Sequence, residues 1–322
     1  MDGFVRSQSG PVAMGYYDST LMPFINSLAR TYPVCDNYFS SVMAQTYPNR
    51  RFLLAGTSMG EIDDDAASTT RPPNGTILEM LNTYDISWKN YYTASSHTPS
   101  YLVWLYLLGE PAADVSSKAV DISNFFSDAA AGTLPAVSLV DPNFSTQSEE
   151  NPQDVQYGDQ FMSQVINAVT SSPQWPSTLL VWTYDEGGGY YDHVPPPVAL
   201  APDGIPPVVP PGASTYDGFS RYGFRVPAVV VSPYAVRAGL THVLHDHTSV
   251  LAMVERKWNL PAMTFRDANA NDLTDFLDMA ALRTGTPTFP QLPALPPSGL
   301  SGATLACSTT GPGTIPPPGS ST

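Results

Sequence analysis

Two patterns of hydrophobic and polar positions alternate along the chain. Segments with apolar residues three and four positions apart are typical of helices with one buried face, as at Leu21, Phe24, Ile25 and Leu28. Short continuous apolar runs, such as residues 226–231 (VPAVVV), are typical of strands buried on both faces. Their alternation favours a mostly parallel sheet covered by helices on both sides.

The patterns predict several elements with definite positions. Helices are expected over residues 21–32, 76–84, 101–108, 154–169, 247–258 and 272–281, and strands over 86–93, 135–140, 178–184 and 226–231. Residues 34–58 are expected to combine a short apolar element with a polar loop and a second apolar piece at 52–55. Residues 285–322, rich in Pro, Gly, Ser and Thr, are expected to form an extended or disordered tail after a domain over 1–284.

Carboxylates follow two of the predicted strands. Asp141 comes directly after one of them, and the pair Asp185-Glu186 comes after the other. Binding sites in parallel α/β folds lie beyond the carboxyl ends of the strands. Because an unpaired carboxylate is costly to bury, we expect a cation here. Two alternatives remain open: a divalent metal on hard oxygen ligands, or a salt bridge to an arginine.

Other residues near these positions have a chemical and a structural interpretation. Thr46 in QTYPNR offers a hydroxyl that needs activation by a metal or a base, and Arg50 and Arg51 can match phosphate oxygens. The structural alternative is a proline-containing turn with surface arginines. His193, which follows Asp192 in a loop, is by itself more typical of a hydrogen-bonded structural residue.

His245 and His247 open the helix predicted from residue 247. Each histidine can serve as a ligand, as a general acid or as a partner of the capping residue Asp246. From the local sequence alone, capping and core contacts are favoured over a chemical role. The glycines at 187–189 allow a sharp turn and a close approach of substrate to the backbone.

The charge balance excludes some classes of function. The net charge of −15 argues against non-specific nucleic-acid binding, which needs lysine and arginine against phosphate. An anionic substrate would have to be attracted locally by a metal or an arginine. Only 13% of the residues are charged and 33 are prolines, so many loops are expected, and this composition is compatible with secretion.

Cysteine and targeting signals are sparse. Cys35 and Cys307 can form at most one bridge, so the chain is not a disulfide scaffold. No apolar run reaches the roughly 18 residues needed to span a membrane. Residues 1–17 lack the apolar region of a signal peptide.

Several separated stretches resemble the bacterial phosphoesterase family of phospholipases C and acid phosphatases. They are residues 15–57 with TYPNR, 183–197 (TYDEGGGYYDHVPPP), 226–235 (VPAVVVSPYA), 247–258 (HTSVLAMVERKW) and 266–279 (RDANANDLTDFLDM). The resemblance spans about residues 1–280. It implies an alkaline-phosphatase-like fold, a three-layer α/β/α sandwich with a mostly parallel central sheet, and hydrolysis of phosphate esters through a covalent intermediate.

The resemblance also implies roles for individual residues. Thr46 is expected to be the nucleophile and, with Asp185 and Glu186, a ligand of one divalent metal ion. Arg50 and His193 are expected to act in catalysis, and Asn49, Asp192 and His247 to bind substrate. The substrate would be a phospholipid or a small phosphomonoester, with no nucleic-acid partner and a location in the cell envelope or outside the cell.

Two departures from the family pattern leave alternatives open. Family members carry an upstream strand that ends in a Glu-Asn pair, and residues 1–20 contain no such segment, so we expect an N-terminally incomplete domain with an exposed strand edge. A family Glu-His-Pro stretch is replaced by Glu150-Asn151-Pro152. The alternatives are a catalytically inactive phosphate- or ligand-binding remnant, or a metal-stabilised structural protein.

Overall fold

The computed structural model describes residues 3–6, 13–64, 71–93, 117–150, 153–209, 216, 219–289 and 295. The helices of this part are α1 (Gly3–Arg6), α2 (Pro23–Thr31), α3 (Thr46–Ala55), α4 (Ile77–Thr83), α7 (Ile122–Ala131), α8 (Val155–Thr170), η2 (Trp175–Ser177), α9 (His247–Trp258), α10 (Phe265–Ala268), η3 (Leu273–Phe276) and α11 (Met279–Thr284). The strands are β1 (Val34–Cys35), β2 (Trp88–Tyr92), β3 (Ala119–Asp121), β4 (Val137–Val140), β5 (Leu180–Thr183), β6 (Ala228–Val231) and β7 (Leu240–Thr241).

The strands form two hydrogen-bonded ladders. One has the order β3-β2-β4 and is entirely parallel. The other has the order β5-β6-β1-β7, in which β6 is antiparallel to both neighbours and β7 is parallel to β1. The described residues between β5 and β6 contain no helix, and an antiparallel pair needs no helical crossover. The expected parallel arrangement therefore holds for one ladder, whereas the other is mixed.

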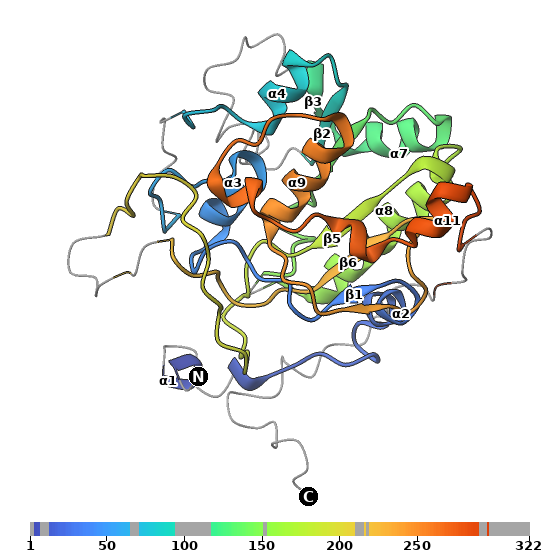
Figure 1. Ribbon diagram of the computed structural model, residues 1–322. Coiled ribbons are helices and arrows are strands. Elements are labelled where there is room, and N and C mark those ends of the chain that lie inside the picture. Colours follow the sequence, from blue (N-terminus) through green and yellow to red (C-terminus); the bar gives the residue numbers. More distant parts are fainter. Residues whose placement is uncertain are drawn as a thin grey trace, which may run out of the picture.

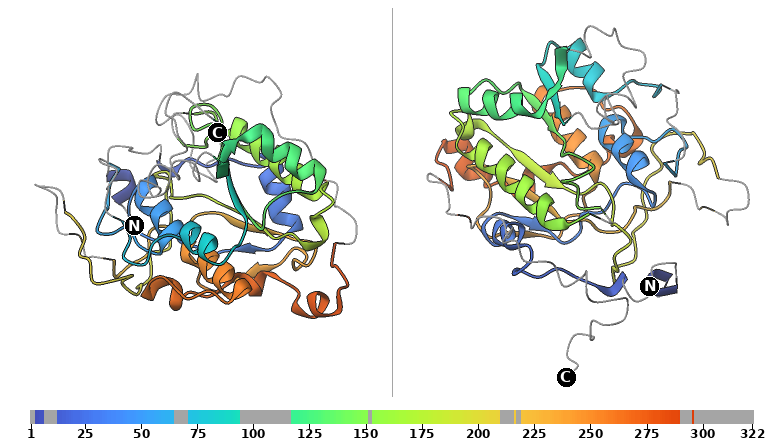
Figure 2. Two further views of the ribbon diagram at one scale, coloured as in Figure 1. Left: turned by 90° about the horizontal axis from the view of Figure 1, so that it is seen from above. Right: turned by 180° about the vertical axis from the view of Figure 1, so that it is seen from behind.

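Helices cover the strands on both sides, which confirms the predicted three-layer α/β/α architecture (Figures 1 and 2). Helices α2, α7 and α8 lie on one side, and α3, α4, α9 and α10 on the other. The first layer buries a core around Phe24, Leu28 and Phe161, and the second a core around Leu54 and Leu251. No described helix has the length and apolar character that a membrane span requires.

All four predicted strands form, and so do the helices predicted near 21–32, 76–84, 154–169 and 247–258. The polar loop expected around TYPNR is wrong, because helix α3 begins at Thr46. Pro48 is compatible with this first turn, where the backbone N–H has no partner within the helix. Gly56, at φ +69°, ends α3 in the left-handed conformation that favours glycine.

The single helix expected over 272–281 is also wrong. Two short helices, η3 and α11, replace it because an aspartate caps each one: Asp272 accepts from the Thr274 N–H at 2.9 Å, and Asp278 from the Ala280 N–H at 3.0 Å. The helix expected over 101–108 lies outside the described residues, as does Cys307.

The start of the expected tail packs on the domain. Phe289 is buried, with its ring centroid 4.6 Å from that of Tyr32. Beyond this residue only position 295 is described, so the extended tail stays a prediction. Cys35 is a buried free thiol, and burial raises its pKa to about 12.

A buried pair of carboxyl groups joins α9 to α10. Glu255 is 6% exposed and Asp267 is 2% exposed. Asp267 accepts from the backbone N–H groups of Met263 at 2.7 Å and Thr264 at 2.9 Å, which fixes its charge in place. Burial, together with the charge of Asp267, raises the pKa of Glu255 to about 9.

This pair should make the folded state less stable as the pH rises. An unfolded glutamate releases its proton near pH 4.3, whereas folded Glu255 holds it to about pH 9. Between these values the folded state binds more protons, so the free energy of unfolding should fall by up to about 1.4 kcal/mol per pH unit. Urea denaturation across this window should show that Glu255→Gln flattens the decline.

The exposed Asp85→Asn exchange is the matched control, because it removes one carboxylate that is exposed instead of buried. It should leave the decline unchanged. If Glu255→Gln and Asp85→Asn give the same pH dependence as the parent chain, Glu255 does not retain its proton in the folded state.

Candidate active site

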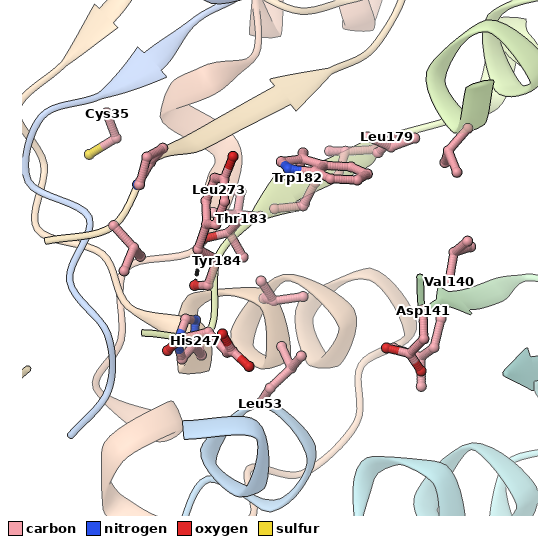
Figure 3. Close-up of a pocket in the computed structure, with 18 of the residues that line it drawn as sticks. Cys35, Leu53, Val140, Asp141, Leu179, Trp182, Thr183, Tyr184, His247 and Leu273 are labelled. Atoms are coloured by element: carbon pink, nitrogen blue, oxygen red, sulfur yellow. Dashed lines mark hydrogen bonds between the residues drawn. The ribbon is translucent and has the colours of Figure 1, made fainter. Parts of the chain in front are cut away.

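One cavity of about 1750 Å³ brings together all the residues that the sequence placed in a site. Its lining includes Thr46, Asn49, Arg50, Asp185, Glu186, Asp192, His193 and His247. Asp141, which follows β4, also lines the cavity (Figure 3). The carboxylates expected at the ends of β4 and β5 therefore line one cavity, and the roles of the eight residues stay predictions.

Arg50 connects the two carboxylates that follow the strands. Its Nε donates to Asp185 Oδ2 at 2.8 Å, and its Nη1 donates to Asp141 Oδ1 at 3.0 Å. Its guanidinium carbon lies 4.8 Å from the centre of the Phe144 ring. The arginine salt bridge, one of the two alternatives for Asp185, is thus present in the structure.

Burial alone would lower the pKa of Arg50, but the charges of Asp185 and Asp141 raise it overall. The guanidinium is therefore a permanent charge at this position. Neither Arg50 nor Arg51 is a surface residue, because the side chain of Arg50 is 15% exposed and Arg51 is fully buried and paired with Glu61. Asp141 is 4% exposed and also accepts from the Asn90 amide at 2.8 Å, so it is held on both sides.

Thr46 is the first residue of α3 and lies one turn before Arg50, so both side chains are on the same face of the helix. The loop before Thr46 is held by Asn49, whose amide accepts from the Val42 N–H at 3.0 Å and donates to the carbonyls of Ala44 and Gln45 at 3.0 Å. Asn49 is fully buried, and these bonds occupy its polar atoms. In this structure it positions Thr46, and substrate binding by Asn49 stays a prediction.

The side chain of Asp64, which is not part of α3, lies beside the first turn of that helix. The sequence analysis did not predict this contact. Its Oδ1 accepts from the Tyr47 N–H at 2.7 Å, so a carboxylate caps the positive end of α3. Burial, together with the nearby charges of Asp185 and Asp63, raises the pKa of Asp64. The pKa of Glu150 is raised by burial and by Asp185 and Asp64.

Glu186 forms one cluster with Asp185, Glu150 and Asp64, and these four residues are called the acidic group. Its Oε2 accepts from the Gly188 N–H at 2.7 Å in a turn where Gly188 and Gly189 have φ of +61° and +78°. These angles explain the need for glycine there. Burial and the charges of Asp185, Glu150 and Asp64 raise the pKa of Glu186 to about 7.

The chemistry of these donors fits a divalent cation, because several carboxylates repel one another and Arg50 neutralises only part of their charge. Their positions fit less well. Among the residues that the structure describes, no three His, Cys, Asp or Glu side chains converge in a metal-binding arrangement. The metal centre therefore stays a prediction, with Thr46, Asp185 and Glu186 as its candidate ligands.

His247 supports the loop that carries the acidic pair. Its Nε2 donates to the Asp185 carbonyl oxygen at 2.8 Å, which leaves Nδ1 as a buried acceptor with no hydrogen-bond partner in the described part of the chain. Burial lowers the pKa of His247, so the ring is neutral near pH 7. His247 lines the cavity, and its role toward substrate stays a prediction.

Asp192 and His193 lie at the rim of the cavity and differ in role. Asp192 accepts from Arg225 Nε at 2.9 Å and Nη2 at 2.6 Å, and these bonds outweigh burial and lower its pKa. The side chain of His193 is 74% exposed and lies 3.9 Å from Asp192. Asp192 therefore anchors the rim, whereas His193 points to solvent; their roles toward substrate stay predictions.

The sequence indicated only some of the residues that line or support this site. Asp141 was visible as a residue after a strand, but its link to Arg50 was not. Asp64 lies seventeen positions after the residue that it caps, beyond any local motif. Tyr184 donates to Glu149, and burial raises the pKa of Glu149 to about 7; neither residue has a local signature.

Comparison with known proteins identifies the family. Residues 1–261 match the model of the Phosphoesterase family. Non-specific phospholipase C3 of Arabidopsis thaliana is 30% identical over an alignment that covers 91% of this chain and 59% of that protein. Phospholipase C A of Mycobacterium tuberculosis is 32% identical over 323 residues, which cover 89% of this chain and 62% of that protein.

A solved structure from Vibrio parahaemolyticus, a protein in the alkaline phosphatase superfamily, aligns with a TM-score of 0.47 at 11% identity, over 82% of this chain and 66% of that one. The chain spans about three fifths of the length of the two phospholipases C. The match of the family model covers most of the chain, including TYPNR and the acidic segment after β5. The chain belongs to the Phosphoesterase family.

Proposed function

We propose that this chain hydrolyses phosphate esters, with the hydroxyl of Thr46 as the nucleophile. The observation that carries this proposal is the position of Thr46 and Arg50 on one face of α3. Arg50 binds Asp141 and Asp185, so that face is held against the ends of β4 and β5. Thr46 therefore lines the same cavity as Asp185 and Glu186.

The start of α3 is suited to the negative charge of a phosphate. Backbone N–H groups and the helix dipole favour an anion at the N-terminus of a helix. The carboxylate of Asp64 already binds there through the Tyr47 N–H. We infer that phosphoryl oxygens would bind at this helix end beside Thr46.

The proposal includes one divalent metal ion held by Thr46, Asp185 and Glu186. When bound, the ion would lower the pKa of the Thr46 hydroxyl and neutralise charge on the phosphoryl oxygens. His193, exposed at the rim, would act as the general acid that protonates a leaving alkoxide. His247, which lines the same cavity, would contact the substrate.

The substrate class has two members under this proposal. The names of the two relatives point to phospholipids, whereas a small phosphomonoester fits the same chemistry. Action in the cell envelope or outside the cell is part of the proposal and rests on the resemblance alone. The rates of hydrolysis of a phosphate monoester and of a phosphocholine diester would distinguish the two substrate classes.

A second candidate is a ligand-binding protein without turnover. The observation that favours it is that Asp185 is already paired with Arg50, while no three metal-ligating side chains converge in the described part of the chain. Binding of inorganic phosphate or vanadate without hydrolysis would support this candidate.

Replacement of the Thr46 hydroxyl tests the nucleophile. Thr46→Ala should reduce kcat at least about a thousandfold, because no group remains to form the covalent intermediate. Thr46→Ser retains a hydroxyl and should keep much of the activity. Hydrolysis of p-nitrophenyl phosphate and p-nitrophenyl phosphorylcholine would be measured for the parent and both variants across several divalent metals. Equal rates for the parent and Thr46→Ala would refute the assignment.

Metal binding should depend on Glu186 and on pH. Glu186→Gln should weaken the binding of Mn²⁺, Ca²⁺ or Zn²⁺ at least about tenfold in calorimetric titration, because a charged ligand is lost. The pKa of Glu186 is about 7, so below that pH protons compete with the metal. Affinity should rise about tenfold per pH unit up to about pH 7 and then level off.

The exposed Asp85→Asn exchange is the control for this titration and should leave the affinity unchanged, because Asp85 does not line the cavity. An unchanged dissociation constant in Glu186→Gln would exclude Glu186 as a ligand. A flat pH profile in the parent chain would show that Glu186 does not exchange its proton for the metal.

A further inference from the structure

The segment that carries the acidic pair begins where a strand ladder ends. The ladder between β5 and β6 ends with Thr183, so the positions of residues 184–188 depend on side-chain bonds instead of ladder bonds. Arg50 of α3 binds the Asp185 carboxylate at 2.8 Å, and His247 of α9 donates to the Asp185 carbonyl oxygen at 2.8 Å. Both contacts come from the helix layer that contains α3 and α9.

Tyr184 adds a contact on the side of α8, which belongs to the other helix layer. Its hydroxyl donates to the carboxyl group of Glu149, which lies in the loop between β4 and α8 and packs against Gly158 of that helix. Tyr184 directly precedes Asp185 in the chain. The segment after β5 is therefore held from both helix layers.

Helix α8 has a gap that admits the Glu149 side chain. Gly158 lies near the start of this helix, and a Cβ atom at position 158 would overlap the Glu149 side chain at Cγ and Cδ. Glycine is a poor helix former. The sequence therefore gives up helix propensity at a position where a larger side chain would displace Glu149.

The surroundings of the Glu149 carboxyl group do not favour its burial. Its Oε1 is buried and has no hydrogen-bond partner in the part of the chain that the structure describes. Burial and the charge of Asp159 raise the pKa of Glu149 to about 7. A buried carboxyl group with an unpaired oxygen costs stability, and such local conflicts are typical of functional sites.

We propose that Glu149 is a positioning residue that, through the Tyr184 hydroxyl, holds Asp185 and Glu186 in place at the cavity. Arg50 and His247 restrain the segment from one side of the sheet, and loss of the Tyr184 contact would release it on the other side. The part of this inference that concerns turnover rests on the proposed function. The positioning itself rests on the contacts of Glu149 and Tyr184 alone.

Tyr91 provides a matched tyrosine–carboxyl contact outside the cavity. Its hydroxyl donates to Asp128 Oδ2 at 2.6 Å, and neither Tyr91 nor Asp128 lines the cavity. Tyr91 is fully buried. Tyr91→Phe therefore removes a comparable hydrogen bond and shows how much of any effect is due to lost stability.

Amide hydrogen exchange tests the positioning without any substrate. The Glu186 N–H donates to Asp185 Oδ1 at 3.1 Å, and the Gly188 N–H donates to Glu186 Oε2 at 2.7 Å. Tyr184→Phe should accelerate the exchange of both amides at least about tenfold, because the segment opens more often. Tyr91→Phe should leave their exchange unchanged.

Replacement of Glu149 separates the hydrogen bond from the charge. Glu149→Gln retains an oxygen that accepts from Tyr184, so exchange at Glu186 and Gly188 should stay within about threefold of the parent chain. Glu149→Leu removes the acceptor and should accelerate exchange as Tyr184→Phe does. The double exchange Tyr184→Phe/Glu149→Leu should add nothing further, because both changes remove the same bond.

Turnover tests the consequence for chemistry. With p-nitrophenyl phosphate and the most effective divalent metal, Tyr184→Phe and Glu149→Leu should each lower kcat about tenfold and change KM less than about twofold. Glu149→Gln should keep the kcat of the parent chain within about threefold, because the hydrogen bond is retained. Tyr91→Phe should leave kcat unchanged.

Equal exchange at Glu186 and Gly188 in Tyr184→Phe and Tyr91→Phe would overturn the proposal. Equal acceleration at Val229 and Val231, which are buried in β6, would also overturn it, because lost stability would then be the cause. Accelerated exchange with an unchanged kcat would make the hydrogen bond a structural contact and refute the positioning role. Accelerated exchange in a chain whose parent shows no turnover would support the positioning and refute the proposed hydrolysis.

Discussion

The paired contact of Arg50 with Asp141 and Asp185 determines the geometry of this molecule at its functional end. The two carboxylates follow strands of different ladders, and the ladders share no strand pairing among the described residues. Without a cation between them, the buried carboxylate of Asp141 and the half-buried one of Asp185 would repel each other and the strand ends would separate. Arg50 comes from α3, so the same contact also fixes the helix that begins with Thr46. One guanidinium therefore fixes the relative positions of α3, β4 and β5.

This arrangement has a consequence for electrostatics. Arg50 pairs with Asp141 and Asp185, while the pKa values of Glu186, Glu150 and Asp64 are raised by burial and by neighbouring carboxylates. The surplus of negative charge lies at the mouth of the cavity, beside the positive end of α3. His247 adds no charge because burial keeps it neutral. The site therefore offers oxygen donors for a cation in addition to the guanidinium of Arg50, so an arginine and a metal are not exclusive interpretations of the acidic pair.

The sequence predicted the parts of this structure that local patterns determine. Continuous apolar runs identified β4, β5 and β6, and the rule that sites lie beyond the carboxyl ends of strands placed Asp141 and Asp185 together. The direction of β6 could not be predicted, because a strand buried on both faces has the same apolar run in a parallel or an antiparallel ladder. The start of α3 was missed since Pro48 is typical of turns as well as of first helical turns. Asp64 was missed because it caps a residue distant in sequence, and Asn49 was interpreted chemically although its bonds hold the backbone before Thr46.

The cavity links the packing of the strands to the chemistry of the site. The residues of β4 and β5 are half-buried and line the cavity, whereas those of β6 are buried. Asp141 and Asp185 directly follow β4 and β5, and Arg50 bridges them. Because the described carboxylates do not converge into a three-ligand set, cation binding would require the ends of these two strands to shift relative to each other. Cation affinity and the packing of β4 against β5 are therefore coupled through the contacts of Arg50.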